Sequence, residues 1–278
     1  MRFVTFNANG IRARLHQIEA IDQAHRPDVI AVQETKVDDT QFPVEAVQAI
    51  GYEHLVIHGQ KGHYGVALFS RIPPTDAQCG FPWREADQQR RFVCASYDVG
   101  GRRVQVINGY FPQGESRDHP VKFPAKAQYY SDLTRYLNER CDPRAPLIVA
   151  GDMNVAPEDT DIGIGEDNRK RWLRTGKTSF LPEEREWLAT LMDWGLTDAY
   201  RRHVGDGEQG GGEPRYSWFD YRSRGFERDP KRGLRIDLVL TTEALTDAVA
   251  DCGIDYRIRG SQKPSDHCPV WCHFTPAD

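Results

Sequence analysis

Short apolar runs that end in polar residues recur along the whole chain, and they limit what this sequence can fold into more than any other feature. Such runs, bounded by turn residues, are typical of strands buried in a sheet. Several successive runs have short connections, which favours antiparallel pairing. The runs lie at 3–6, 29–33, 64–70, 92–97, 103–109, 147–150, 235–241 and 269–274.

Helical patterns separate some of these runs, at 15–24, 125–140 and 183–194. Pro27 marks the end of the first pattern. The apolar stripe of the third, between Trp187 and Met192, is more typical of core packing than of cofactor contact. Because strands and helices mix without strict alternation, we expect an α/β fold with two mixed, mainly antiparallel sheets packed face to face and helices outside. We expect one domain over 1–278.

The composition excludes several classes of protein. The chain of 278 residues is 39% hydrophobic and 28% charged, with a net charge of −5, so a polyanionic partner would need a local basic face. No apolar run reaches the length of a membrane span or signal peptide, which predicts a cytoplasmic protein with no membrane partner. Six cysteines without a CxxC pair predict neither a disulfide scaffold nor a zinc site, and Cys268 and Cys272 are expected in the core.

The segment PLIVAGDMNVAP, 146–157, places Asp152 and Asn154 directly after a buried strand and Gly151. Glycine allows a turn or the close approach of another group. In an extended backbone, Asp152 and Asn154 would point to the same side. Taken alone, an ordinary surface turn explains these residues better.

Other chemically active side chains occupy equivalent places. Four groups follow strands and two stand at strand beginnings, and in antiparallel neighbours one strand's start lies beside the other's end. We therefore expect all of them along one edge of the fold. The groups after strands are Asn7, Glu34, Tyr110 and Asp152 with Asn154, and those at beginnings are Asp237 and Asp266 with His267.

Four carboxylates this close repel one another unless a cation is present or some are protonated. The donors are almost all oxygen, which indicates Mg²⁺, with Mn²⁺ as a substitute, rather than zinc. Glu34 is the first choice as a ligand, although a strand-end pair with Lys36 would explain it equally well. Asp237 is a better partner than Asp266 for His267, because adjacent side chains in extended chain point apart.

This collection suits hydrolysis of a phosphodiester. The reaction needs a positioned water, charge relief on the non-bridging oxygens and help for the leaving oxygen. Asp152 can orient or deprotonate the water, and Tyr110 can assist the attacking or leaving oxygen. Asn7, Asn154 and His267 can donate hydrogen bonds to phosphoryl oxygens. The residues leave open whether Asp152 or the Tyr110 phenolate activates the water.

Nine segments together resemble the exonuclease III family, the bacterial apurinic/apyrimidinic endonucleases of the endonuclease/exonuclease/phosphatase superfamily. The resemblance runs from Met1 to beyond His267. The segments are FNANGIRAR, QETKV, NGYFPQGESRDHP, GDMNVAPED, RKRWLRTGK, SFLPEEREW, SWFDYRS, GLRIDLVL and KPSDHCPVW.

The resemblance implies a four-layered α/β sandwich like deoxyribonuclease I. It implies Mg²⁺-dependent cleavage 5′ to abasic sites in duplex DNA, 3′→5′ exonuclease activity and removal of blocked 3′ ends. By motif, the eight strand-end residues match the family's active site, with Glu34, Asn7 and Asp266 at the metal, and Gln113, Trp218 and Phe219 match positions beside the abasic nucleotide. The glycine-rich stretch 205–212 departs from the family pattern.

Two polar segments carry basic and aromatic residues that could bind DNA. Residues 215–235 hold six arginines and one lysine against two aspartates and one glutamate, and such patches bind phosphates. The other segment surrounds Trp172 with Arg169, Lys170, Arg171 and Arg174. A solvated surface is the usual explanation of a charge run, and local packing is an alternative for Trp218 and Phe219.

Three functions compete. The first is a DNA-repair nuclease, and the second is a phosphatase of the same superfamily that acts on a non-nucleic-acid phosphoester. The third is a nucleic-acid-binding protein without catalysis, which unused carboxylates would disfavour because they repel phosphates. The basic aromatic segments favour the first. We expect a monomer, because no spare apolar helix face stands out.

Overall fold

The predicted apolar runs form the central strands of two six-stranded sheets. The computed structural model describes residues 1–85, 89–205 and 215–275. The first sheet has the order β11-β12-β1-β2-β4-β3 and the second β5-β6-β7-β8-β10-β9. Only the pairs β1–β2 and β7–β8 are parallel among the described strands.

The first sheet comprises β1 (Arg2–Asn7), β2 (Val29–Gln33), β3 (His54–His58), β4 (Val66–Ser70), β11 (Val249–Ile254) and β12 (Val270–Phe274). The second comprises β5 (Pro74–Cys79), β6 (Phe92–Val99), β7 (Arg102–Tyr110), β8 (Leu147–Asp152), β9 (Leu196–Asp198) and β10 (Asp237–Thr242).

Burial explains which strands carry apolar runs. Every residue of β2, β4, β8 and β10 is buried, because these strands are covered on both faces. The edge strands β3 and β5 contain no buried residue. The sequence of β5, PTDAQC, shows no apolar run, and the run in β3, HLVIH, is only three residues long between two histidines. The sequence analysis missed both strands, together with β9 and β11.

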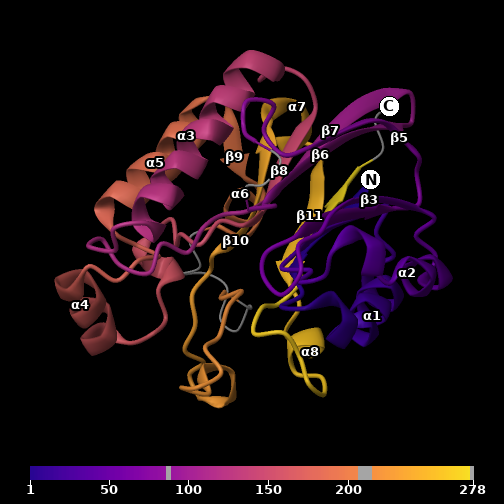
Figure 1. Ribbon diagram of the computed structural model, residues 1–278. Helices are drawn as coiled ribbons and strands as arrows, with labels where there is room; N and C mark the ends of the chain where they lie inside the picture. Colours follow the sequence, from indigo (N-terminus) through magenta and orange to yellow (C-terminus); the bar gives the residue numbers. More distant parts are fainter. Residues whose placement is uncertain (86–88, 206–214, 276–278) are drawn as a thin grey trace.

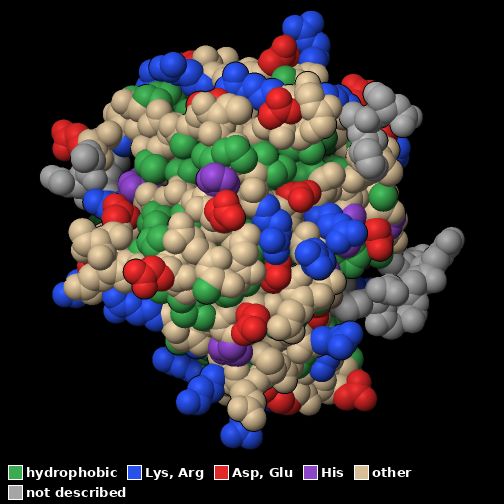
Figure 2. All heavy atoms as spheres, turned by 90° about the vertical axis from the view of Figure 1, so that its right-hand side faces the viewer, with side chains coloured by type: hydrophobic (Ala, Val, Ile, Leu, Met, Phe, Trp, Pro, Cys, Tyr) green, Lys and Arg blue, Asp and Glu red, His purple; other side chains and the backbone are tan. Residues whose placement is uncertain are grey.

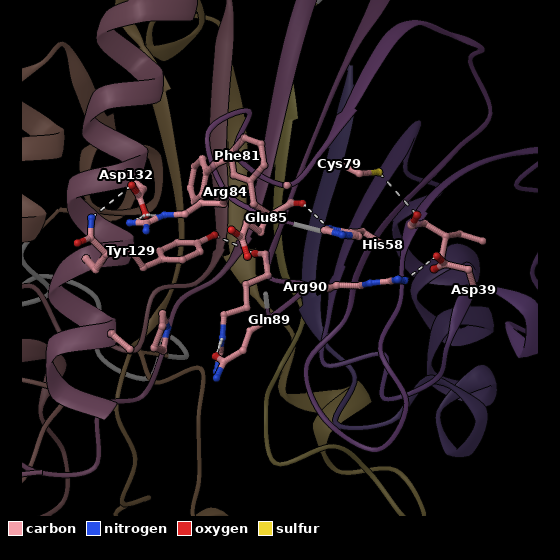
Figure 3. A pocket seen from close by; sticks show the side chains of 17 residues that line it. Asp39, His58, Cys79, Phe81, Arg84, Glu85, Gln89, Arg90, Tyr129 and Asp132 are labelled. Atoms are coloured by element: carbon pink, nitrogen blue, oxygen red, sulfur yellow. Dashed lines mark hydrogen bonds and ion pairs between the residues drawn. The ribbon is translucent and has the colours of Figure 1, made fainter. Parts of the chain in front are cut away.

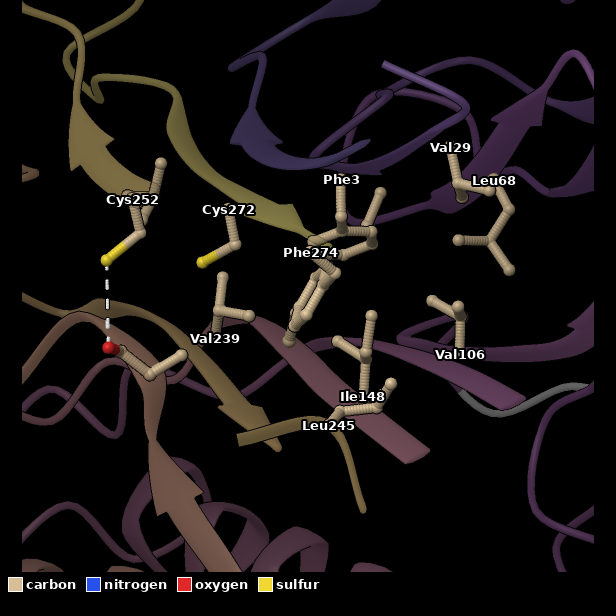
Figure 4. Close-up of a cluster of buried hydrophobic side chains, with 14 of the residues drawn as sticks. Phe3, Val29, Leu68, Val106, Ile148, Val239, Leu245, Cys252, Cys272 and Phe274 are labelled. Carbon is tan, nitrogen blue, oxygen red and sulfur yellow. Dashed lines mark hydrogen bonds between the residues drawn. The ribbon is translucent and has the colours of Figure 1, made fainter. Parts of the chain in front are cut away.

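The main core lies between the two sheets. Figure 4 shows Phe3, Val29 and Leu68 of the first sheet facing Val106 and Ile148 of the second. All five side chains are buried. Cys268 and Cys272 belong to the same cluster and form no disulfide, as predicted.

Helices cover the outer faces of the sheets, so the molecule has four layers (Figure 1). In the cluster beneath α1 and α2, Ile18 and Val47 pack against residues of the first sheet. In the cluster beneath α3 and α5, Leu133 and Leu188 pack against the second sheet, which confirms the fold and the core stripe of the third helical pattern. The helices are α1 (Leu15–His25), α2 (Val44–Ile50), α3 (Lys122–Arg140), α4 (Glu166–Thr175), α5 (Pro182–Asp193), α6 (Ala199–Val204), α7 (Glu243–Thr246) and α8 (Tyr256–Arg259). Short 3-10 turns lie at Ile11–Ala13, Asp39–Gln41, Asp159–Asp161 and Gly225–Glu227.

Two buried amides join the sheets close to the strand ends. Gln33 Nε2 donates to Asn108 Oδ1 at 2.7 Å. Asn108 Nδ2 in turn donates to the carbonyl oxygens of Val32 and Ala67 at 3.0 and 2.9 Å. Because buried amides keep fixed partners, these contacts set how β2 and β4 lie against β7.

Charges of both signs intersperse over the face that Figure 2 displays, with no single-sign patch on that side. No helix in the described ranges has the length and apolarity needed to cross a bilayer. Of the glycine-rich stretch 205–212, residues 206–212 lie outside the described residues.

Candidate active site

The end of β8 shows why glycine precedes Asp152. Gly151 has φ 139° and lies opposite Gly109 of β7. A Cβ atom at position 151 would stand 1.9 Å from the Gly109 carbonyl oxygen, so the close approach predicted from the sequence is present. The strand ends at Asp152 and Asn154 has φ 53°, so the extended backbone considered from the sequence does not continue. Asp152 Oδ1 instead accepts the backbone N–H of Asn154 at 3.0 Å.

Asn7 joins residues of the two sheets at this edge. Its Nδ2 atom donates to Glu34 Oε1 and to Asp152 Oδ2, both at 2.9 Å. Asn7 ends β1 and Glu34 follows β2, whereas Asp152 ends β8 of the second sheet. The parallel pairs β1–β2 and β7–β8 therefore bring their carboxyl ends to one place, as the strand pattern predicted.

His267 completes the group from the start of β12. Its Nδ1 atom lies 2.8 Å from Asp237 Oδ2, and its Nε2 atom lies 3.8 Å from Asp152 Oδ2. Asp237 is the cross-strand neighbour of Asp152. The partner predicted for the imidazole is therefore the one that the structure provides, and the Nδ1 contact leaves Nε2 directed toward Asp152.

Backbone conformation turns Glu34 into this group. Glu34 has φ 52°, which is unfavourable for a residue with a side chain, and Lys36 repeats it with φ 54°. The Glu34 carbonyl oxygen accepts the Gly10 N–H at 2.7 Å, and Lys36 N–H bonds to the Tyr64 carbonyl oxygen at 3.0 Å. Neighbouring loops thus hold a strained turn, as is common at functional sites.

The carboxyl groups differ in their proton affinity. Burial raises the pKa of Glu34, but the charge of Lys36 and hydrogen bonds from Lys36 and Asn7 outweigh burial, so its pKa is lowered. Burial, with the nearby charges of Asp237 and Glu34, raises the pKa of Asp152 to about 7 despite the opposing charge of His267. Two carboxyl groups whose oxygens lie within 4.8 Å of each other therefore titrate in different ranges.

The neighbouring acids also favour protonated forms of two other groups. Burial lowers the pKa of His267, but the charges of Asp237 and Asp152 reverse this effect and raise it to about 10. Burial and the charges of Glu34 and Asp152 hold the pKa of Tyr110 well above its usual value. Arg91 lies 4.6 Å from the centre of the Tyr110 ring and opposes that shift. The imidazole is thus a cation and the phenol a neutral donor at neutral pH.

The donor set fits a divalent cation. Glu34, Asp152 and His267 each offer a ligand atom within 4.8 Å of the others. Because the His267 imidazole is protonated at neutral pH, the two carboxylates are the ligands that remain, and hard divalent cations prefer such oxygen donors. Asp237 adds further negative charge beside them. A divalent metal site is therefore supported, whereas the identity of the ion stays a prediction.

Asp266 does not belong to that group of three. Its Oδ1 atom accepts the side-chain N–H of Asn9 at 2.8 Å, and its Oδ2 atom accepts Trp218 Nε1 at 3.0 Å. The sequence analysis named Asp266 as a metal ligand; here each of its oxygens accepts one hydrogen bond, a carboxylate has further acceptor sites, and the metal role stays a prediction. The pair of Glu34 with Lys36, which the sequence left open as an alternative, is present, with Lys36 Nζ 2.8 Å from Glu34 Oε2. The sequence analysis missed Asn9, which lies two residues beyond Asn7.

Two of the three residues predicted beside an abasic nucleotide lie at accessible positions. Gln113 is exposed and its Nε2 donates to Thr178 Oγ1 at 3.1 Å, and Trp218 is half-buried. Phe219 is fully buried and packs edge-on against Phe226 and Tyr256. The ring of Phe219 therefore anchors the loop in this structure, which is the alternative that the sequence left open, and its contact with an abasic nucleotide stays a prediction.

The basic segment around Trp172 forms α4, which stands away from the sheets at the lower left of Figure 1. It contains no buried residue. Arg169 pairs with Asp159 at 2.5 Å, and Lys170 lies 3.5 Å from Glu166. Trp172 stacks on Phe180 with parallel planes. The aromatic ring thus fixes the helix to the body, while Arg171 and Arg174 stay exposed.

A buried ion pair that sequence reasoning missed supports the loops of the site. Lys126 and Glu184 are both fully buried, with Nζ and Oε1 2.5 Å apart. Lys126 Nζ also donates to the Asn154 carbonyl oxygen at 2.8 Å and to the Gln113 carbonyl oxygen at 3.4 Å. Glu184 Oε2 accepts two backbone N–H groups, from Ser179 and Leu181. One ion pair therefore joins three loops.

A cavity of about 680 Å³ lies between α3 and the segment that connects β5 to β6 (Figure 3). Two half-buried arginines of its lining have acidic partners. Arg84 pairs with Asp132 at 2.6 Å and Arg90 with Asp39 at 2.7 Å. The charges of these two arginines are therefore neutralised.

Comparison with known proteins identifies the class. The sequence model of the endonuclease/exonuclease/phosphatase family matches residues 4–267. The chain belongs to this family.

Individual relatives are also similar over their whole length. The chain is 51% identical to exodeoxyribonuclease III of Haemophilus influenzae, over 99% of this chain and 100% of that protein. Among solved structures, the 3′ phosphatase NExo from Neisseria, bound to a product DNA hairpin, superposes with a TM-score of 0.86 at 36% identity, covering 99% of each chain. An AP endonuclease from Archaeoglobus fulgidus gives a TM-score of 0.85 at 33% identity, again over 99% of each chain.

These similarities confirm the family resemblance and the deoxyribonuclease I-like sandwich that the motifs implied. They also confirm the prediction of a hydrolase of the nuclease class. The role of each side chain at the strand ends stays a prediction.

Proposed function

We propose that this protein is a DNA-repair nuclease that uses a divalent metal ion to hydrolyse duplex DNA on the 5′ side of abasic sites. It also removes nucleotides and blocking groups from 3′ ends. The observation that carries the proposal is the meeting of Glu34, Asp152 and His267 from both sheets within 4.8 Å. The names of the relatives, exodeoxyribonuclease III, 3′ phosphatase and AP endonuclease, support the same reaction class.

Asp152 is the group that takes the proton from the attacking water. A general base works best when its pKa lies near the working pH, and the pKa of Asp152 is raised to about 7. The Tyr110 phenol, whose pKa is raised well above its usual value, is protonated at that pH. This difference favours Asp152 over a Tyr110 phenolate, the alternative that the sequence left open.

The other polar groups stabilise the charge that develops on phosphorus. His267 holds a proton on each ring nitrogen at neutral pH, with Nδ1 fixed by Asp237, so Nε2–H can donate to a phosphoryl oxygen. In the proposed reaction, the Tyr110 hydroxyl and the Asn154 amide donate to other phosphoryl oxygens, and Asn154 Nδ2 is held by the Phe111 carbonyl oxygen at 2.9 Å. Fixed donors aimed at developing negative charge lower the barrier most.

A bound Mg²⁺ ion, or Mn²⁺ in its place, would be held by Glu34 with help from Asn7 and would supply charge neutralisation at the phosphate. Glu34 suits this task because its pKa is lowered, so it is ionised at neutral pH. Asn7 holds Glu34 and Asp152 together through one amide nitrogen. Asn7 therefore fixes the spacing of the two carboxylates.

DNA contacts come from surfaces beside this edge. Trp218 is half-buried and Gln113 exposed, and these residues face the sugar of an abasic nucleotide in our proposal. The basic residues of α4, namely Arg169, Lys170, Arg171 and Arg174, hold phosphates further along the duplex. The protein acts as a monomeric single-domain enzyme of the cytoplasm, as the sequence predicts.

Cleavage of a defined duplex tests the proposal. The substrate is an oligonucleotide duplex with one abasic site, incubated with Mg²⁺ or with EDTA. We expect Mg²⁺-dependent nicking 5′ to the lesion and none in EDTA. The control is the same duplex with an intact nucleotide in place of the abasic site. Equal nicking of the two duplexes would refute abasic-site specificity.

Two substitutions separate catalysis from binding. Asp152→Asn should reduce cleavage by roughly 10²–10⁴-fold, the contribution of a general base, while DNA affinity in EDTA stays similar. Asp142→Asn, an exposed acid whose partner is Arg144, serves as the control and should cut at the wild-type rate. Cleavage of inositol or lipid phosphoesters with no cleavage of DNA would instead favour a phosphatase of the same family.

A further inference from the structure

A continuous chain of polar contacts joins Glu34 to Trp218, and the proposed reaction does not use it. Its first half begins at the Glu34 carboxylate, where Oε2 lies 2.8 Å from Lys36 Nζ. Lys36 Nζ also donates to Asn9 Oδ1 at 2.5 Å. The ammonium group is thus shared between a predicted metal ligand and a neighbouring amide.

The second half runs from the same amide to the indole. Asn9 Nδ2 donates to Asp266 Oδ1 at 2.8 Å, and Trp218 Nε1 donates to Asp266 Oδ2 at 3.0 Å. The backbone strengthens this end, because Phe219 N–H donates to the Asp266 carbonyl oxygen at 2.9 Å. Asp266 therefore holds Trp218 through its side chain and the next residue through its backbone.

The direction of every bond in this chain is fixed by chemistry. Lys36 has only donors and the Asp266 carboxylate has only acceptors. The Asn9 amide must therefore turn its oxygen to Lys36 and its nitrogen to Asp266. Asn9 has φ 46°, and its own N–H bonds to Asn7 Oδ1 at 2.9 Å, so its backbone is held as well.

We propose that Asn9 and Asp266 are positioning residues that link occupation of the cation site at Glu34 to the placement of Trp218. A divalent ion at Glu34 withdraws carboxylate charge from Lys36, and the ammonium then bonds more strongly to Asn9. Polarisation passes along connected hydrogen bonds, so Asn9 and Asp266 hold the indole more firmly. Because coupling between two binding events is reciprocal, a sugar seated on Trp218 raises the affinity of Glu34 for the ion by the same factor.

This inference rests on the proposed function only for what Trp218 contacts, and the linkage itself can be measured without DNA. The experiment titrates the protein with MgCl₂ and records tryptophan fluorescence. The signal of Trp218 is the difference between the wild type and Trp218→Phe. We expect a saturating change in this difference signal, at the same Mg²⁺ concentrations at which calorimetry detects binding.

Asn9→Gly interrupts the chain at its middle. Glycine accepts a positive φ without strain, so the backbone is preserved. We expect the Mg²⁺-induced Trp218 signal to be lost, while calorimetry shows an affinity for Mg²⁺ within about tenfold of wild type, below the larger losses typical of groups that contact metal ligands. Asn9→Asp, which keeps the shape but replaces the donor with an acceptor, should give the same loss if Asn9→Gly does not fold.

Two controls make the test decisive. Asn138→Ala removes an exposed amide of α3 that bonds only to the Thr134 carbonyl oxygen among its described contacts, and it should keep the full signal. Asp266→Asn should lose the signal and keep Mg²⁺ affinity if Asp266 positions Trp218. A Trp218 signal that persists in Asn9→Gly, or a large loss of Mg²⁺ affinity in Asp266→Asn, would overturn the inference and restore Asp266 as a metal ligand. Failure to cut abasic DNA would affect the proposed function alone.

Discussion

Substitution of Lys126 by methionine tests the idea that one buried ion pair holds the loops of the site. Methionine has a similar length but no charge, so the change leaves the Glu184 carboxylate buried with two backbone donors and no cation. Both side chains are fully buried and 2.5 Å apart. Removing one partner of such a pair costs about 3–5 kcal/mol. Each kcal/mol lowers the melting temperature Tm of a domain of this size by about 2–4 °C, which predicts a fall of about 6–20 °C.

Differential scanning calorimetry of matched variants measures this effect. Lys122→Met is the control, because Lys122 also lies on α3 and pairs with Glu115 at 2.5 Å, but both side chains are more than half exposed. It should leave Tm almost unchanged. Lys126→Met combined with Glu184→Gln should recover most of the loss, because a neutral pair leaves no uncompensated charge.

The same variants report on catalysis. Lys126 Nζ holds the carbonyl oxygen of Asn154, so the double variant should fold but turn over more slowly, with kcat reduced more than KM is changed. Equal Tm values for Lys126→Met and Lys122→Met would refute the argument, because a buried and an exposed pair would then contribute alike.

Three further predictions follow from the charges at the strand ends. The pKa of Asp152 is raised from 3.8 to about 7, so the free energy of unfolding of the metal-free protein falls as pH rises from about 4 to about 7. This loss is at most about 4 kcal/mol above pH 7. Asp152→Asn should abolish it, and urea unfolding at pH 4 and pH 8 measures the difference. Asp237→Asn should lower kcat by roughly 10²–10⁴-fold, because His267 loses the carboxylate that orients its ring and raises its pKa. The pH profile of kcat should shift to lower pH, and an unchanged profile would contradict this role. Mg²⁺ at a hundred times its Kd should stabilise the wild type by about 2.7 kcal/mol, and Glu34→Gln should lose this gain in a thermal shift assay.

Most of the fold follows from where strands are buried. Strands covered on both faces, such as β2 and β8, carry apolar runs that the sequence displays directly. Edge strands such as β5 expose part of every side chain, and their polar residues leave no apolar run in the sequence. Helix α4 was missed for a related reason, because a helix without buried residues has no apolar stripe.

Prediction of the site succeeded for residues whose position in a strand fixes their direction. Asn7, Asp152 and Asp237 end or begin strands, so strand alignment alone brings them together. It failed for residues that depend on turns and on packing between distant segments. Asn9 reaches Asp266 from a turn with φ 46°, and the burial of Phe219 depends on packing against Phe226 and Tyr256.

The reacting groups are divided between the sheets, with Asn7 and Glu34 on one and Asp152 and Asp237 on the other. Hydrolysis therefore requires the two halves of the sandwich to stay in register with each other as well as within themselves. A small slide at their interface would separate the groups while leaving every strand intact. The amide contact between Gln33 and Asn108, close behind the site, resists such a slide. On heating, the turnover rate should therefore fall when the two halves lose their alignment, before either half melts.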